Sequence, residues 1–196
     1  MYIFIFIIVC ISFILSLAFA IVLKYNYLTT AALFFTVIAD IFLILLGRYF
    51  AIGLIFFNIV QILYAGRIFR NRDDKKYFKP LISQIALRTV TAIVAIIIIT
   101  LVLEFDWVLI LVAVYATNFS FNLIFLGMRF KRDAMFGVGL VLFAFCDIFV
   151  GLLNLSDYTD ITINRSVIFA LMAICYIPSQ IIIAISTAHK QPSPQL

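Results

Sequence analysis

The chain has 196 residues, of which 66% are hydrophobic and only 12% are charged, with a formal net charge of +5. A water-soluble domain of this length cannot bury so much apolar surface. The composition therefore excludes a soluble globular protein and indicates a polytopic membrane protein of one compact bundle. The positive charge is concentrated in a few segments, as an orientation signal is, so we expect no nucleic-acid partner.

Seven apolar runs are separated by short polar segments, and each is close to the ~20 residues that cross ~30 Å of hydrocarbon. The first run lacks a basic segment and a small-residue cleavage site, so we expect a retained helix and not a removed signal peptide. The predicted fold is an all-α bundle over residues 1–188, followed by a disordered polar tail at 189–196. The predicted transmembrane helices lie at about 2–23, 28–46, 49–69, 81–103, 107–127, 134–153 and 166–187.

Basic residues gather on one side of this bundle. Eleven Lys and Arg residues fall in one set of connecting segments and the tail, whereas the opposite set has only Arg48 and Arg165. This bias predicts that the N-terminus is outside and the C-terminus is in the cytoplasm. The remaining basic residue, Arg88, lies within a span, and we expect its side chain to reach toward the cytoplasmic headgroups.

Two aspartates lie inside apolar runs and share the local sequence Asp-Ile-Phe-x-x-Leu-Leu, beginning at Asp40 and at Asp147. A carboxylate in hydrocarbon costs several kcal/mol unless it is paired, hydrated or protonated, so intramembrane acids usually have a function. In the predicted orientation each aspartate lies six residues before the outer end of its span, about 9 Å below the boundary. We therefore expect both carboxylates at one depth.

Further polar residues lie within spans three, five and seven, deeper in the membrane. In span three they follow one helix face at i, i+3 and i+6. One interpretation is that these amides and hydroxyls join helices together. The other is that they bind a substrate, and the residues we expect to do so are Asn58, Gln61, Tyr64, Tyr115, Asn118, Tyr176 and Gln180.

The residue types exclude several chemistries. The only histidine, His189, is in the tail, so neither a His-rich zinc site nor a Ser-His-Asp or Cys-His nucleophile is available. No phosphate-binding glycine motif is present, and we expect no metal and no cofactor. The three cysteines have no paired spacing and are expected to be small buried hydrophobes. Two-carboxylate chemistry, ion or proton translocation, and a purely structural pair remain.

Several motifs recur in a fixed order along the chain. Span three contains Gly53-x-x-x-Phe57-x-x-x-Gln61-x-x-Tyr64, span six contains Gly139-x-x-x-Phe143-x-x-x-Asp147, and span seven contains Tyr176-x-x-x-Gln180-x-x-x-Ala184. With Val114-Tyr115 and the Asp40 segment, these resemble the YhhN family of integral membrane proteins, whose animal members are lysoplasmalogenases. The resemblance runs from about Thr29 to Ser186.

The resemblance implies a hydrolase that cleaves the vinyl ether bond of lysoplasmalogens to a fatty aldehyde and a glycerophospho-ethanolamine or -choline. Its paired aspartates correspond to Asp40 and Asp147. One would act as general acid, and the other, ionised, would stabilise the oxocarbenium ion and orient water. The partner implied is a lipid substrate within the bilayer of a bacterial-type cell membrane.

The chain departs from the family pattern in three places. Ala39 stands where the family usually has Gly, Gln61 stands where it usually has His, and we count seven spans where the family pattern suggests eight. Because glutamine cannot shuttle protons, a catalytically inactive member is one alternative. A small-solute transporter is another, because the shared motif of spans two and six would also fit a 3+1+3 helical repeat around span four.

Overall fold

A computed structural model of the chain describes residues 2–23, 26–46, 49–70, 78–102, 106–128, 133–156 and 164–188. Within these residues the protein is all-helical, and seven helices are long and apolar enough to cross a membrane. The helices are α1 (Tyr2–Leu23), α2 (Tyr27–Asp40), α3 (Phe50–Arg70), α4 (Phe78–Val102), α5 (Trp107–Gly127), α6 (Ala134–Ser156) and α7 (Arg165–Ile185). A π-helical segment, Ile41–Leu45, continues α2, and a short 3₁₀ helix, Ser186–Ala188, follows α7.

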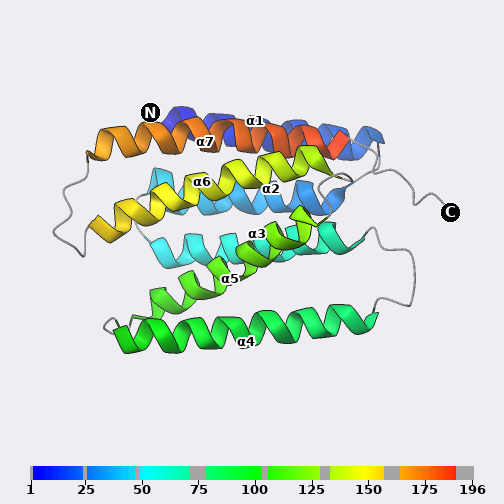
Figure 1. Ribbon diagram of the computed structural model, residues 1–196. Helices are drawn as coiled ribbons and strands as arrows, with labels where there is room; N and C mark the ends of the chain where they lie inside the picture. The colour runs from blue at the N-terminus through cyan, green and yellow to red at the C-terminus, as the bar shows by residue number, and fades with distance from the viewer. Residues whose placement is uncertain are drawn as a thin grey trace.

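The seven predicted spans are confirmed. The predicted tail at 189–196 lies outside the described residues, as do residues 71–77 between α3 and α4. In the bundle, α1 begins at one end and α7 finishes at the other, as an odd number of spans requires (Figure 1). Which end faces the cytoplasm stays a prediction.

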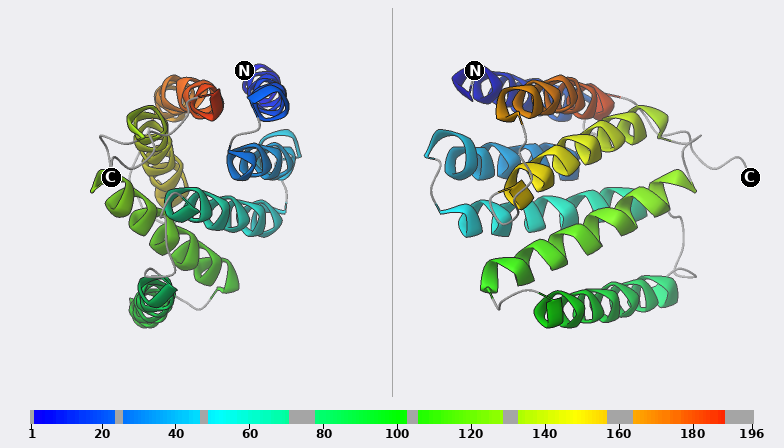
Figure 2. Two further views of the ribbon diagram at one scale, coloured as in Figure 1. Left: turned by 90° about the vertical axis from the view of Figure 1, so that its right-hand side faces the viewer. Right: turned by 60° about the vertical axis from the view of Figure 1, so that its left-hand side comes forward.

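Six of the helices form a ring. Contacts link α1 to α2, α2 to α3, α3 to α5, α5 to α6 and α6 to α7, and α7 closes the ring on α1. The remaining helix, α4, lies at the edge of the bundle and packs against α5 (Figure 2). The ring interior is therefore built without α4, and α4 is the helix most exposed to lipid.

Polar residues between the apolar runs determine where two of the helices begin. The carboxylate of Asp106 accepts a hydrogen bond from the backbone N–H of Val108 at 3.0 Å, at the start of α5. The side-chain oxygen of Asn164 accepts one from the N–H of Val167 at 3.3 Å, at the start of α7. These side chains satisfy N–H groups that the first turn of a helix leaves without a partner.

Aromatic side chains pack together in the ring interior and join α3, α5, α6 and α7. The Phe143 ring contacts Phe57, Phe119 and Tyr176 at centroid distances of 5.8, 5.6 and 5.7 Å. Tyr115 contacts Phe57 at 6.0 Å and Phe119 at 5.8 Å. Such pairs contribute about 0.5–1.5 kcal/mol each beyond the burial of area. They also hold two tyrosine hydroxyls in fixed positions within the bundle.

Helices α6 and α7 approach each other closely at Gly139. A Cβ atom on this glycine would lie 2.7 Å from Cγ1 of Ile183, 3.2 Å from the backbone nitrogen of Ile183 and 3.3 Å from the carbonyl oxygen of Ser179. Two of these three neighbours are backbone atoms, which cannot rotate away. Small residues permit this kind of close helix packing in membranes.

We expect Gly139→Val to lower the free energy of unfolding by about 1–3 kcal/mol, because the added side chain forces α6 and α7 apart. Thermal unfolding in detergent, followed by circular dichroism, measures the effect. Gly151 on the same helix is the matched control, since nothing lies within 4 Å of a Cβ atom there. Equal unfolding midpoints for Gly139→Val and Gly151→Val would contradict the prediction.

Candidate functional site

Asp40 is the last residue of α2 and is 1% exposed. Its Oδ2 accepts a hydrogen bond from the hydroxyl of Tyr176 on α7 at 2.6 Å. Directly after Asp40 the helix widens, because the N–H of Leu46 donates to the carbonyl oxygen of Ile41, five residues earlier, at 2.9 Å. Single π turns within α-helices are frequently found at functional sites. The carboxyl group thus lies at an irregular point of a transmembrane helix.

Asp147 on α6 has the same kind of partner. Its Oδ2 accepts a hydrogen bond from the hydroxyl of Tyr115 on α5 at 2.5 Å, and the pair is partly buried. Among the described residues, neither this carboxyl group nor that of Asp40 forms a salt bridge. Each acid is therefore held by one tyrosine hydroxyl and is not neutralised by a described cation.

Both Asp–Tyr pairs adjoin the aromatic cluster, because Tyr115 and Tyr176 belong to it. The ring of Phe143 contacts Tyr176 directly and reaches Tyr115 through Phe57. In addition, Ala39, which precedes Asp40, and Cys146, which precedes Asp147, belong to the same buried core cluster. The structure therefore brings both aspartates, from helices far apart in the sequence, to the same part of the ring interior.

On α7, Tyr176 and Gln180 lie on either side of Pro178. Proline has no backbone N–H and disturbs the hydrogen-bond ladder of the preceding turn. The hydroxyl of Ser179 donates to the carbonyl oxygen of Tyr176 at 2.7 Å in this region. Both α2 and α7 thus depart from regular helix geometry where they contribute side chains to the site.

Besides Oδ1 of the partly buried Asn58, polar atoms of three fully buried residues in the predicted substrate-binding set have no hydrogen-bond partner among the described residues. These atoms are Nε2 of Gln61, Oη of Tyr64, and both amide atoms of Gln180. All three side chains are fully buried. Buried polar groups are nearly always hydrogen-bonded, so each of these atoms is suited to bind water or a polar ligand.

Two other predicted substrate-binding residues lie at helix contacts. Nδ2 of Asn58 donates to the carbonyl oxygens of Leu54, on its own helix, and of Leu111 on α5, at 3.0 and 3.3 Å. The side-chain and backbone oxygens of Asn118 accept from Nη1 of Arg88 at 3.3 and 3.4 Å. No described contact joins either asparagine to an aspartate. Their role in substrate binding stays a prediction.

Asn122 was not among the predicted substrate-binding residues, but it connects α4 to the ring interior. Its Nδ2 donates to the backbone and side-chain oxygens of Gln61, both at 2.9 Å, and its Oδ1 accepts from Nη2 of Arg88 at 2.9 Å. Gln61 lies one helical turn after Phe57, whose ring contacts that of Tyr115, and the hydroxyl of Tyr115 donates to Asp147. Asn122 follows Tyr115 by seven residues, or two helical turns, so both side chains lie on the same face of α5. This spacing could have identified Asn122 from the sequence as part of the candidate site.

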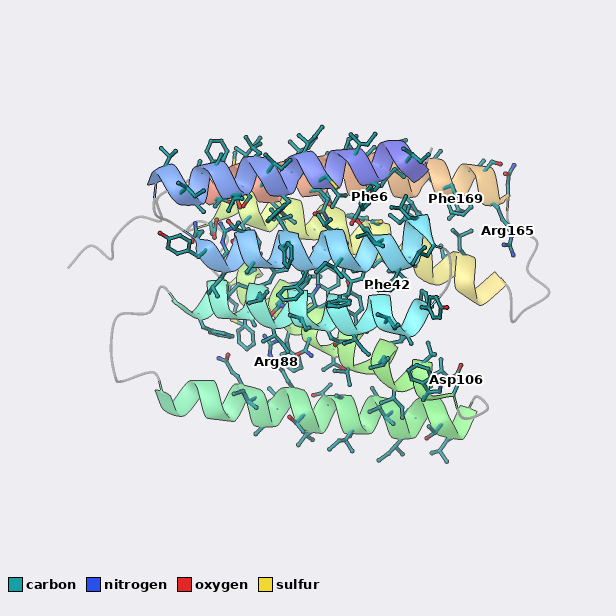
Figure 3. The ribbon with its side chains drawn as sticks, turned by 180° about the vertical axis from the view of Figure 1, so that it is seen from behind. Phe6, Phe42, Arg88, Asp106, Arg165 and Phe169 are labelled. Atoms are coloured by element: carbon teal, nitrogen blue, oxygen red, sulfur yellow. The ribbon has the colours of Figure 1, made fainter. Side chains whose placement is uncertain are left out.

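The expectation that Arg88 reaches toward the headgroups was wrong. Its guanidinium group turns from α4 toward α5, into the space between α4 and the rest of the bundle (Figure 3). The physical reason is that the oxygens of Asn118 and Asn122 lie within hydrogen-bond distance on α5. Hydrogen bonds join Arg88 to Asn122 and Asn122 to Gln61, and a further one joins Tyr115 to Asp147. We call these five polar side chains the α4–Asp147 polar chain.

A second buried polar cluster lies where α6 begins and α7 ends. Arg67 of α3 is 1% exposed and forms a salt bridge with Asp133, with 2.9 Å between Nη2 and Oδ2. Its Nη1 donates to Thr29 and Ser186 at 2.7 and 2.8 Å, and the guanidinium carbon lies 4.0 Å from the centre of the Phe136 ring. The sequence had indicated Arg67 only as part of the basic orientation signal. In the structure it holds four helices together.

The fold and the candidate site define a multi-pass integral membrane protein whose interior holds two aspartates, each hydrogen-bonded to a tyrosine of another helix. The YhhN family model matches residues 3–187, and the chain belongs to the YhhN family. This confirms the resemblance seen in the sequence motifs. Searches of curated proteins and of solved structures each found no match.

Proposed function

We propose that this protein is an intramembrane hydrolase that cleaves the vinyl ether bond of lysoplasmalogens to a fatty aldehyde and a glycerophospho-ethanolamine or -choline. Membership of the YhhN family supports this proposal. The main structural support is the pair of intramembrane acids, Asp40 and Asp147, each held by a tyrosine hydroxyl without a described counterion. Ionisable groups kept in this way are typical of proton-transfer sites in membranes.

The reaction needs a proton donor beside a carboxylate. Proton transfer to the carbon β to the ether oxygen gives an oxocarbenium ion, water adds to the cationic carbon, and the hemiacetal collapses to an aldehyde and a glycerol hydroxyl. One aspartate would supply the proton, and the other would stabilise the cation and accept a proton from the attacking water. Tyr115 and Tyr176 orient the two carboxyl groups, and each uses only one carboxyl oxygen.

The surroundings of the acids suit a lipid with one polar and one apolar part. The aromatic cluster around Phe143 offers an apolar surface to the alkenyl chain. The unpartnered polar atoms of Gln61, Tyr64 and Gln180 offer hydrogen bonds to the attacking water or to a glycerol hydroxyl. Gln61 cannot carry a proton, so in this mechanism it acts as a hydrogen-bonding group beside Tyr115.

The transporter alternative is less well supported by the contacts of the two acids. In a 3+1+3 repeat, α2 corresponds to α6 and α3 corresponds to α7. The tyrosine that binds Asp40 lies on α7, so the repeat would place the partner of Asp147 on α3. It lies instead on α5. The two Asp–Tyr pairs are therefore not repeats of each other, and we favour the hydrolase.

The purified protein, reconstituted in lipid vesicles with a lysoplasmenylethanolamine, should release a fatty aldehyde that mass spectrometry detects after derivatisation. The matched control is the 1-alkyl ether of the same chain length. It lacks the double bond that receives the proton, so it should remain intact. Intact vinyl ether lipid after incubation with folded protein would contradict the proposed function.

A further inference from the structure

Arg88 carries a positive charge that no described residue neutralises. It lies five residues inside the span Ser83–Leu101, about 7.5 Å from where the span begins. Its hydrogen bonds go only to neutral oxygens of Asn118 and Asn122, and no salt bridge in the described part of the chain includes it. An unpaired charge within a transmembrane helix is costly, and such residues mark binding sites or pathways.

The guanidinium group of Arg88 is held among aromatic rings. Its central carbon lies 5.5 Å from the ring centre of Phe121, 5.8 Å from that of Phe125 and 6.0 Å from that of Phe69. Arg88 and these three rings are all partly exposed. A planar guanidinium group fixed by rings and amide oxygens is well arranged to bind a phosphate oxygen pair, because little freedom is lost on binding.

A second polar group lies next to this charge. Gln84 is one helical turn before Arg88, and its Oε1 is buried without a hydrogen-bond partner among the described residues. This oxygen can accept a hydrogen bond from an ammonium or hydroxyl group. Gln84 is closer than Arg88 to the end of the bundle where α4 begins. Along α4, the hydrogen-bond acceptor of Gln84 therefore lies nearer the membrane surface, and the positive charge of Arg88 lies deeper in the membrane.

Helix α4 exposes much apolar surface beside this place. Helix α4 packs against α5 and lies outside the ring (Figure 2). Many of its large apolar side chains are exposed, as expected for a helix surrounded by acyl chains. They are Ile85, Leu87, Val90, Ile93, Val94, Ile97, Ile98 and Leu101.

The spacing along α5 between the partners of Arg88 and the partner of Asp147 suits a glycerophospholipid. Asn118 and Asn122, which both bind Arg88, follow Tyr115 by three and seven residues, about 4.5 and 10.5 Å along α5. In a lysoplasmalogen the extended glycerol separates the phosphate from the vinyl ether by on the order of 8 Å, from ordinary bond lengths. A phosphate at Arg88 would thus place the vinyl ether near the level of Tyr115 and Asp147.

We propose that Arg88 binds the phosphate of the lysophospholipid substrate, at a site between α4 and α5 that opens to the bilayer. Oε1 of Gln84 then accepts a hydrogen bond from the ethanolamine ammonium group. The glycerol follows the α4–Asp147 polar chain toward Asp147. This inference rests on the proposed function, since it assigns the headgroup end of the same substrate.

The test compares two substrates with the same alkenyl chain, a lysoplasmenylethanolamine and a 1-alkenylglycerol without phosphate. We expect wild-type protein to prefer the phospholipid in kcat/KM, and Arg88→Gln to lower that value about tenfold to a hundredfold, mainly through KM. Turnover of the alkenylglycerol should change far less. Arg88→Lys should restore part of the preference, and Thr91→Val, on the lipid side of α4, is the control. Equal effects of Arg88→Gln on both substrates would overturn the proposal.

A binding measurement separates this proposal from the proposed function. The probe is a 1-alkyl lysophosphatidylethanolamine, which cannot be hydrolysed at a vinyl ether, and native mass spectrometry measures its retention. Even in a protein that releases no aldehyde, wild type should retain this lipid about tenfold more tightly than Arg88→Gln, with equal retention of 1-alkylglycerol. Equal retention of the phospholipid by both proteins, or its full displacement by inorganic phosphate, would overturn the lipid-phosphate site.

Discussion

Asp40→Asn and Asp147→Asn should each abolish the release of aldehyde from a lysoplasmenyl lipid. Asparagine has nearly the size of aspartate and can still accept the hydrogen bond from Tyr176 or Tyr115. It can neither donate a proton to the vinyl ether nor carry the negative charge that stabilises the cation. Since general acid–base groups contribute about 10²–10⁴-fold to rates, we expect a loss of at least about 100-fold for each variant.

The initial rate of aldehyde release, measured at equal protein concentration, checks this prediction. Elution from a sizing column and the thermal unfolding midpoint should match those of wild type. The double variant should be no slower than the single ones, because the two acids act as a unit. Asp106→Asn is the control, since Asp106 only begins α5 and asparagine begins helices equally well. Turnover retained in either single variant would exclude the acid-pair mechanism.

Arg67→Met should destabilise the bundle by about 3–5 kcal/mol, the usual cost of removing one partner of a buried ion pair. The carboxylate of Asp133, whose side chain is 11% exposed, would lose its salt-bridge partner. Thr29 and Ser186 would each lose a hydrogen-bond donor. Unfolding in detergent by heat or by denaturant measures the change. The effect should be far larger than that of Arg88→Met, because the Arg88 guanidinium binds only neutral oxygens and is partly exposed.

A double-mutant cycle separates the ion pair from the packing of Arg67 against Phe136. Arg67→Met with Asp133→Leu removes both charges, and it should regain part of the stability that Arg67→Met loses. If the losses of the two single variants simply add, Arg67 and Asp133 do not act as a pair. An unchanged unfolding midpoint in Arg67→Met would show that this cluster does not hold the helices together.

The number and positions of the helices could be predicted from the sequence, because run length and polar boundaries determine them directly. Asp106 and Asn164 separate apolar runs in the sequence, and in the structure they begin α5 and α7. The sequence gives no comparable signal for the π turn that follows Asp40. Residues 41–45 are uniformly apolar, and the widened turn depends on packing against neighbouring helices.

The sequence predicted residues of the candidate site but not the hydrogen bonds between them. The cost of charge in hydrocarbon singles out Asp40 and Asp147, whatever the fold. Their hydrogen bonds to Tyr176 and Tyr115 join residues 136 and 32 positions apart, and no periodicity within one helix can show such pairs. The roles of arginines were missed for the same reason. A count of charges predicts the orientation of the chain in the membrane. The direction of an arginine side chain depends instead on oxygen atoms of other helices, which such a count does not include.

Small hydroxyl residues were a further omission. Ser16 on α1 is fully buried and forms hydrogen bonds of 2.9 Å with both Thr30 of α2 and Thr187, which follows α7. In the sequence these residues are isolated polar positions in apolar runs, which is unremarkable for a membrane helix. Interhelical hydrogen bonds of this kind contribute about 0.6 kcal/mol on average. The role of these hydroxyl groups is visible only in the structure, where three separate helices meet at the same end of the bundle.

The π turn after Asp40 affects how this family could vary in length. One residue inserted into an α-helix can be absorbed by a wider turn, and one residue deleted from such a turn restores the regular ladder. Residues 41–45 of α2 are such a place. A relative could therefore gain or lose a residue there while Asp40 and every residue before it keep their positions. The part of the helix beyond Asp40 would adapt to membranes of different thickness, and the acid would stay beside Tyr176.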